Sequence, residues 1–292
     1  MTAGSYRRLA YLGTPDMAVA PLAAMLDAGL PVTDVVTRAD KRRGRGSELS
    51  PSPVKQAAQS AGLTVHHRVD DLLGLGIDLG VVVAFGQLIK PHVLAEIPMV
   101  NLHFSLLPRW RGAAPVERAL LAGDAVTGVC LMRVDEGLDT GAVYDRVEVP
   151  IGPTTTADEL RAELVRRGAA MLVDRLLDGP AGLGDPVDQQ GEPTYAAKLS
   201  SADLHLDWAV PPAQLHRIVR LGGAWTTWRG KRLKVLAAEL VGDRPGDVVD
   251  GSVVGGLALV TVQPEGKAPM AYPGNYLEWV EKTGMEAPGV HR

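Results

Sequence analysis

Short aliphatic runs alternate with helical segments through the first half of this 292-residue chain, and this alternation restricts the possible folds strongly. The strand-like runs are LAYLG, PVTDVVT, LTVHH, DLGVVVAFG, MVNLHFSL and TGVCLMRV. One intervening helix has a complete set of boundary signals, with Ser52 as N-cap, Pro53 at the first helical position and Gly62 at its end. Strands that alternate with helices predict an α/β domain whose sheet is mostly parallel.

A long helix ends this first domain, and the amino-acid pattern changes after it. We expect the helix from Thr156 to about Asp178, because Thr156 and Glu159 form a capping box at its start. The following stretch, 181–205, is rich in Gly, Pro and Asp and is typical of a linker. Short strand-like runs then predict a small β-barrel of the oligonucleotide-binding (OB) type. The predicted domains are 1–180 and 206–292, with the linker between them.

Composition excludes several classes of protein. The single cysteine, Cys130, excludes a disulfide framework and a cysteine-based metal site. No segment reaches the roughly 20 apolar residues that a membrane span requires, and the amino-terminal residues lack the apolar core of a signal peptide. We therefore expect a soluble protein of the cytoplasm.

The net charge of −4 does not suggest nucleic-acid binding by the protein as a whole, so a contact with RNA requires a local patch. The densest basic stretch is RADKRRGRG, from Arg38 to Gly46. Its cationic residues are Arg38, Lys41, Arg42, Arg43 and Arg45. A solvated surface loop is the competing interpretation.

One apolar strand has polar side chains at alternate positions. In an extended strand Asn101, His103 and Ser105 share one face, whereas the hydrophobic residues between them share the other. An acidic turn, Val134 to Tyr144, follows the next strand and contains Asp139. Because loops at the carboxyl ends of parallel strands converge on one edge, we expect the two segments to meet.

An amide, an imidazole and a carboxylate together suit acyl transfer to an amine. Asn101 is placed to donate a hydrogen bond to an oxyanion, and His103 to move a proton with help from Asp139. The same residues also have structural interpretations: a hydrogen-bonded core histidine, a turn cap and a tight-loop aspartate. Spacing alone leaves both possibilities open.

Signals for cofactors and metals are weak. The turn after the first strand, starting at Gly13, lacks the G-x-G-x-x-G pattern of nicotinamide sites. His66 and His67 are adjacent and alternate in direction, and His92, His205, His216 and His291 lack acidic or cysteine partners at ligand spacing. We predict that the protein uses no metal.

The chain resembles the methionyl-tRNA formyltransferase family of the folate-dependent formyltransferase superfamily. The matching pieces, which run in order to about Leu240, are LGTPDMAVAPL, GRGSELSPSPVK, VVVAFGQLIKP, NLHFSLLPRWRGAAPVERALLAGD, TGVCLMRVDEGLDTGAV and TYAAKLSSADLHLDW. The resemblance implies a Rossmann-like formyltransferase domain followed by an OB-like domain that contacts tRNA. It also implies 10-formyltetrahydrofolate as formyl donor and initiator methionyl-tRNA as acceptor.

Site residues follow from the resemblance position by position. Asn101, His103 and Asp139 match the catalytic trio of the family. Residues that match its folate-contacting positions are Ser105, Leu106, Leu107 and Pro108, with Phe85, Gln87, Leu88 and Ile89 along the wall of the pteridine pocket. The basic stretch Arg38 to Gly46 corresponds to the insertion that reaches the tRNA acceptor stem.

Two departures from the family pattern stand out. Many relatives have glycine where this chain has Phe104, but strand alternation aims Phe104 toward packing and away from His103. The last segment, PGNYLEWVEKTGMEAPGVHR, matches the family poorly.

Two other functions remain in view, a formyltransferase for an amino sugar nucleotide and an RNA-binding protein on an inactive enzyme scaffold. The basic stretch favours tRNA over a sugar nucleotide, and the complete trio favours an enzyme over a binding protein. Nothing in the chain indicates an obligate dimer, so we expect a monomer.

Overall fold

The computed structural model describes residues 5–42, 49–228, 230–241, 248–249, 253–254 and 256–271, and the chain divides into two compact units. The first unit comprises Met1–Val116, Val126–Pro150 and Leu160–Ala197. The second comprises Glu117–Ala125, Ile151–Glu159 and Lys198–Arg292. The stretch 181–205 contains short elements of its own, and the domain limits inferred from the sequence stay a prediction.

A seven-stranded sheet forms the centre of the first unit, in the order β10-β9-β7-β6-β1-β2-β5. Neighbours from β5 to β7 pair in parallel, whereas β9 and β10 run antiparallel at one side. The predicted α/β sheet, mostly parallel, is confirmed. The strand bounds are β1 Leu9–Gly13, β2 Val32–Val36, β5 Thr64–His66, β6 Leu79–Val83, β7 Met99–His103, β9 Val126–Arg133 and β10 Val143–Pro150.

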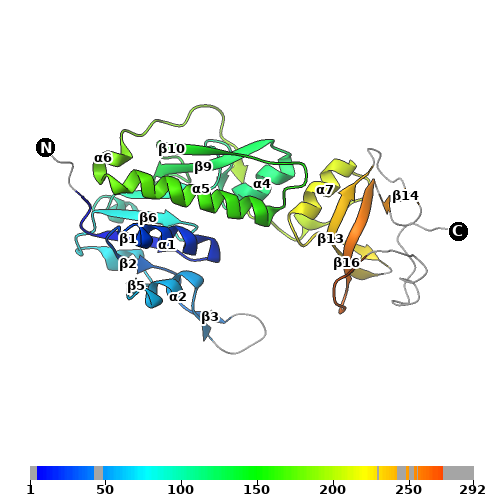
Figure 1. Cartoon of the computed structure of the whole chain (residues 1–292), viewed down its shortest axis with the longest axis horizontal. Helices are drawn as coiled ribbons and strands as arrows, with labels where there is room; N and C mark the ends of the chain where they lie inside the picture. The colour runs from blue at the N-terminus through cyan, green and yellow to red at the C-terminus, as the bar shows by residue number, and fades with distance from the viewer. Residues whose placement is uncertain are drawn as a thin grey trace. The chain divides into compact units, whose positions relative to one another are not determined.

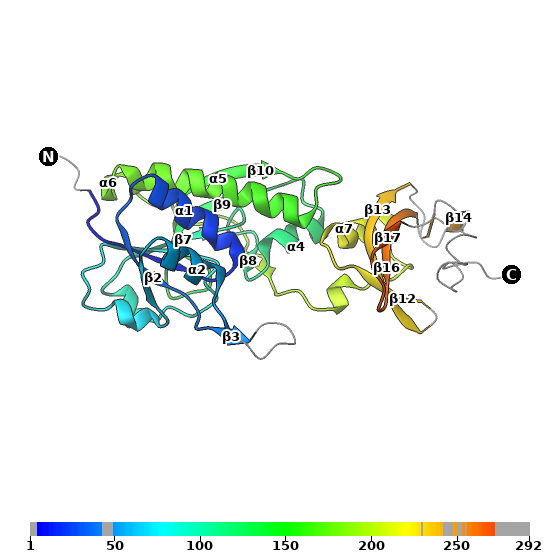
Figure 2. The ribbon, with the colours of Figure 1, turned by 60° about the horizontal axis from the view of Figure 1, so that its bottom comes forward.

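Helices cover this sheet, and every residue of β1 and β6 is buried, as expected for parallel strands covered on both faces. In Figures 1 and 2, α1 and α5 lie side by side on one face. The helices and 3-10 turns of this part of the chain are η1 Asp16–Ala18, α1 Val19–Asp27, α2 Pro53–Ser60, η2 Val69–Leu72, α3 Pro91–Leu94, α4 Pro115–Ala122, α5 Ala157–Leu177 and α6 Pro180–Leu183.

The predicted helix caps are present. The Ser52 hydroxyl accepts a hydrogen bond from the Lys55 amide at 2.9 Å, and Pro53 begins α2. At the start of α5 the Thr156 amide donates to the Glu159 carboxylate at 2.9 Å, and the reciprocal bond is 3.3 Å long. α5 packs closely on the sheet, because a Cβ at Gly168 would lie 3.2 Å from the Leu102 side chain.

Two short strand pairs flank the sheet. β8 (Arg111–Gly112) pairs in parallel with β11 (Tyr195–Ala196), and β3 (Lys41–Arg42) pairs antiparallel with β4 (Leu49–Ser50). The β3–β4 pair borders the basic stretch, of which Arg43 and Arg45 lie outside the described residues, as does the side chain of Arg42.

The second unit is built on an antiparallel sheet in the order β12-β13-β16-β15-β14, with β17 added beside β16. Its elements are η3 Ala202–Leu204, α7 Pro212–Arg220, β12 Trp225–Trp228, β13 Lys231–Leu240, β14 Val248–Val249, β15 Val253–Val254, β16 Leu257–Pro264 and β17 Met270–Ala271. α7 contributes Leu215 and Val219 to a core with Val235 and Leu259 of the sheet. This arrangement confirms the predicted small β-barrel domain, and residues 272–292 lie outside the described part.

No helix in the described residues is long and apolar enough to cross a membrane.

Candidate active site

The carboxyl end of β7 carries the two polar side chains that the sequence singles out. Asn101 pairs with Val82 of β6 on one side and Met132 of β9 on the other, and its side chain is partly exposed. His103 ends the strand with 5% of its surface exposed. Within the described chain the Asn101 side chain makes no hydrogen bond, so its amide is free to donate to a bound substrate.

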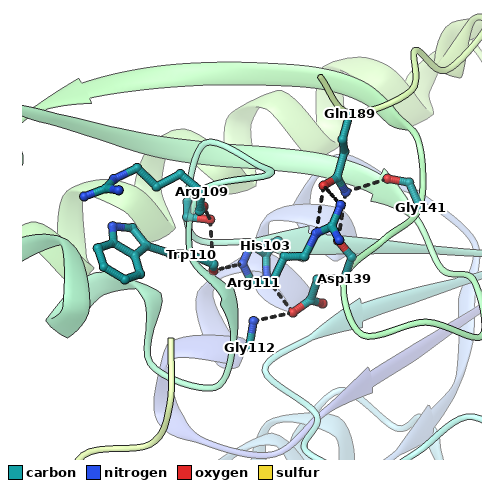
Figure 3. A network of polar contacts seen from close by, with 9 residues as sticks. His103, Arg109, Trp110, Arg111, Gly112, Asp139, Gly141 and Gln189 are labelled. Carbon is teal, nitrogen blue, oxygen red and sulfur yellow. Dashed lines mark hydrogen bonds and ion pairs between the residues drawn. The ribbon is translucent and has the colours of Figure 1, made fainter. Parts of the chain in front are cut away.

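The imidazole of His103 has a defined orientation (Figure 3). Its Nε2 lies 2.8 Å from the carbonyl oxygen of Trp110. Because a carbonyl only accepts, Nε2 carries the hydrogen, which leaves Nδ1 as the nitrogen that exchanges a proton. Nδ1 lies 3.6 Å from Oδ2 of Asp139.

A backbone hydrogen bond and the conformation of its own main chain fix the position of Asp139. The amide of Gly112 donates to its Oδ2 at 2.7 Å, and its side chain is 15% exposed. Its φ of +50° lies in the left-handed region, which aspartate tolerates better than most residues. The carboxylate and the imidazole therefore face each other inside a largely buried site.

The acidic turn and the strand meet as expected, but the route differs from the predicted one. β9 is antiparallel to β7, so β9 ends beside the beginning of β7, where the Val134 amide donates to the Met99 carbonyl at 2.9 Å. The loop then returns along β7 until Asp139 faces His103. Close packing shapes this loop, because a Cβ at Gly141 would overlap the Arg133 carbonyl oxygen.

In the loop after β7, the serine hydroxyl is bonded to main-chain carbonyls of the same loop. Ser105 is fully buried, and its hydroxyl donates to the Arg109 carbonyl at 2.7 Å. Leu107 is also buried, in a cluster with Cys130, and the Leu107–Pro108 peptide is cis. Ser105 thus stabilises the turn that presents the Trp110 carbonyl to His103. Folate contacts by this loop, Leu106 and Pro108 included, stay a prediction.

The loop after β6 combines buried and exposed residues. Phe85 and Ile89 are 5% and 9% exposed and belong to an apolar cluster of the first unit. Gln87 and Leu88 face outward, and Leu88 is 82% exposed. Their predicted place in the pteridine pocket is not tested by these contacts. Phe104 is 5% exposed, as strand alternation predicts.

Other titratable groups do not join the site. Burial raises the pKa of the Cys130 thiol, which lies opposite His103 in the β7–β9 register, so this thiol stays protonated. His92 has an acidic neighbour that sequence spacing missed, since its Nε2 lies 2.9 Å from Asp70. His66 likewise contacts Asp34, at 2.8 Å. Among the residues described, no group of three or more potential metal ligands occurs.

Sequence reasoning missed the residues that surround the trio. Gln189 accepts hydrogen bonds from Arg111 and donates to the carbonyls of Asp139 and Gly141 (Figure 3). The Trp110 amide donates to the Thr194 hydroxyl at 2.9 Å. These contacts are made largely with backbone atoms, so no periodicity or motif in the sequence predicts them.

The arrangement suits one-carbon transfer to a nitrogen nucleophile. A free amide donor lies on the same strand as an imidazole with one fixed nitrogen and one proton-exchanging nitrogen, and a carboxylate faces the latter. These are the parts needed to stabilise an oxyanion and to move one proton.

Comparison with known proteins identifies related chains. Residues 7–176 match the family described as formyl transferase. Methionyl-tRNA formyltransferase of Symbiobacterium thermophilum is 44% identical over 90% of each chain, and that of Corynebacterium efficiens is 41% identical over 97% of each.

Solved structures show the same fold at lower identity. WlaRD, a sugar 3N-formyl transferase, has a TM-score of 0.65 at 19% identity, covering 91% of this chain and 100% of that one. The N-formyltransferase from Helicobacter canadensis, solved with folinic acid and dTDP-3-aminofucose, has a TM-score of 0.65 at 18% identity, covering 88% of this chain and 98% of that one.

Proposed function

This chain belongs to the formyl transferase family, and we propose that it transfers the formyl group of 10-formyltetrahydrofolate to the amino group of methionyl initiator tRNA. The product is formylmethionyl-tRNA, used in translation initiation. The observation that carries the proposal is the similarity to methionyl-tRNA formyltransferases, which extends over 90% or more of both chains at 40% identity or above. We further propose that the enzyme is a cytoplasmic monomer.

The chemistry uses the trio in three roles. The uncharged amino group attacks the formyl carbon, forming a carbon–nitrogen bond and a tetrahedral oxyanion. The Asn101 amide donates to this oxyanion, a contact typically worth about 10²–10³ in rate. The proton lost by the amine moves to Nδ1 of His103, where the Asp139 carboxylate stabilises the imidazolium.

Collapse of the oxyanion completes the transfer. The bond between the formyl carbon and N10 of the folate breaks, N10 takes the proton from His103, and tetrahydrofolate leaves. The net change is one formyl group moved in one direction and one proton in the other. No serine or cysteine nucleophile is needed, in agreement with the buried Ser105 hydroxyl and the protonated Cys130 thiol.

The position of the loops supports a folate donor. Residues 85–89 follow β6, residues 105–108 follow β7, and these two strands are parallel neighbours. In open α/β sheets, ligands bind at the carboxyl ends of the strands. The free side-chain amide of Asn101 lies on β7, so a formyl group delivered to the carboxyl end of this strand would meet an unused hydrogen-bond donor.

The alternative acceptor is an amino sugar nucleotide, because sugar N-formyltransferases share this fold. That likeness is below 20% identity, whereas the tRNA-modifying relatives reach 44%. The basic stretch that begins at Arg38 also suits a polyanionic acceptor better than a sugar nucleotide.

The decisive experiment offers both acceptors to the purified protein with the same 10-formyltetrahydrofolate. We expect formylation of charged initiator tRNA and no turnover of dTDP-amino sugars. Preference for the sugar would overturn the proposed acceptor. Binding of tRNA without turnover would instead support an RNA-binding protein that has lost catalysis.

A further inference from the structure

The segment 187–196, which we call the returning segment, runs back over the loops of the active site. At its beginning, Val187 and Val143 exchange two backbone hydrogen bonds of 2.8 Å. At its end, β11 pairs with β8, and the Arg111 amide donates to the Thr194 carbonyl at 2.8 Å. Both ends are therefore fixed to elements that adjoin the catalytic loops.

Gln189 lies between these two attachments, and both the oxygen and the nitrogen of its side-chain amide form hydrogen bonds. Its Oε1 accepts from Nε and Nη2 of Arg111 at 3.0 and 2.6 Å. Its Nε2 donates to the carbonyls of Asp139 at 2.8 Å and Gly141 at 2.9 Å. Two acceptors and one guanidinium dictate a single orientation of the amide, since the reversed amide would place NH₂ against the guanidinium.

These contacts hold both the main chain and the carboxylate of Asp139, the residue whose carboxylate faces His103. Gln189 holds the main-chain carbonyl of Asp139, and the Gly112 amide holds its carboxylate at 2.7 Å. Gly112 itself has a φ of +111° and lies in β8, next to Arg111. One side chain thus connects the two loops that set the distance between Asp139 and His103.

We propose that Gln189 is a positioning residue for formyl transfer, acting through Asp139 and not on the substrate. This inference rests on the proposed function, because the proton handled by His103 and Asp139 is the one released by the attacking amine. Catalytic groups need to be held within about 0.5 Å of their working geometry. Loss of the two Gln189 donors therefore lowers the rate of the chemical step without weakening substrate binding.

The test uses two substitutions and a matched control. Gln189→Glu keeps an acceptor for Arg111 and removes the donors to Asp139 and Gly141, while Gln189→Met removes both functions at similar volume. Gln190→Glu makes the same charge change at the next residue, which is exposed and donates only to the Asp188 carbonyl at 3.4 Å.

For both Gln189 variants we expect kcat to fall about tenfold or more, with each KM within about twofold of the original value. Gln190→Glu should keep the original kcat. If Gln189 acts through Asp139, then Gln189→Glu placed in an Asp139→Asn background should lower kcat by less than about twofold further.

A second measurement does not depend on activity. Hydrogen exchange of the Gly112 amide reports its bond to Asp139, so it should accelerate in both Gln189 variants and stay unchanged in Gln190→Glu. An unchanged kcat or unchanged Gly112 exchange in Gln189→Glu would overturn the inference, as would an equal loss of kcat in the Asp139→Asn background. If the original protein fails to formylate methionyl-tRNA, the proposed function fails, and Gly112 exchange alone then decides the role of Gln189.

Discussion

Replacement of Asp139 by asparagine tests the charge that the mechanism requires. The substitution keeps the size of the side chain and leaves an oxygen to accept from the Gly112 amide, now 2.7 Å from the carboxylate. It removes the negative charge that lies 3.6 Å from Nδ1 of His103. The rate of the chemical step should therefore fall, because in the proposed mechanism the Asp139 charge stabilises the imidazolium formed by proton transfer.

The size of the effect follows from the separation and burial of the pair. At 3.6 Å two unit charges attract by about 1 kcal/mol in water and about 5 kcal/mol at an effective dielectric constant of about 20. The two side chains are 6% and 15% exposed, which favours the upper part of this interval. Since about 1.4 kcal/mol corresponds to a tenfold change in rate, we expect kcat to fall by about 10²–10³.

The assay is formylation of charged initiator tRNA at saturating 10-formyltetrahydrofolate, with thermal unfolding measured in parallel. The unfolding midpoint should change little, because the substitution preserves the hydrogen bond from Gly112. A kcat within about threefold of the original, in a protein that is fully folded, would show that the charge of Asp139 does not assist the reaction.

Three further predictions address other parts of the chain. Asn101→Ala should lower kcat by about 10²–10³ with little change in either KM, and equal rates in the same assay would exclude an oxyanion role. Neutralising Arg42, Arg43 and Arg45 together should weaken methionyl-tRNA binding and flatten the slope of log K against log salt, whereas an unchanged slope would reject the contact. Burial lowers the pKa of His216 below its usual 6.5, so the unfolded chain binds this proton more readily, and stability should fall as the pH drops below about 6.5. Urea unfolding between pH 7 and pH 5 should show a weaker pH dependence in His216→Gln, and an identical dependence would contradict this assignment.

Local signals in the sequence were sufficient for much of the fold. The caps at Ser52 and Thr156 depend only on neighbouring residues, and both are present. Helical spacing places four leucines of α5 on one face, and all four are buried: Leu160, Leu164, Leu172 and Leu176. The direction of β9 was beyond such signals, since an antiparallel strand and a parallel strand buried in one sheet have the same apolar pattern.

The candidate site was predictable to the extent that its chemistry lies in side chains. Alternation along β7 predicts that Asn101 and His103 share one face of the strand, and the acidic turn brings Asp139 to within 3.6 Å of His103. Ser105 shows where this reasoning ends. Its position in the pattern matches a face that contacts ligand, yet the structure uses its hydroxyl to bond the Arg109 carbonyl. A serine in a turn bonds its own backbone as readily as a substrate, and sequence spacing does not distinguish the two.

Sequence patterns do not predict the role of Gln189, because its partners are two main-chain carbonyls and the guanidinium of Arg111. Every residue has a main-chain carbonyl, so the sequence does not reveal which carbonyls a positioning side chain will bond. The trio alone therefore does not guarantee a working site. A chain with Asn101, His103 and Asp139 intact but with the 187–196 segment released would keep the recognisable pattern and lose the distance that makes the carboxylate effective. The activity of a chain with this trio is thus better judged from the trio together with the segment that returns over it.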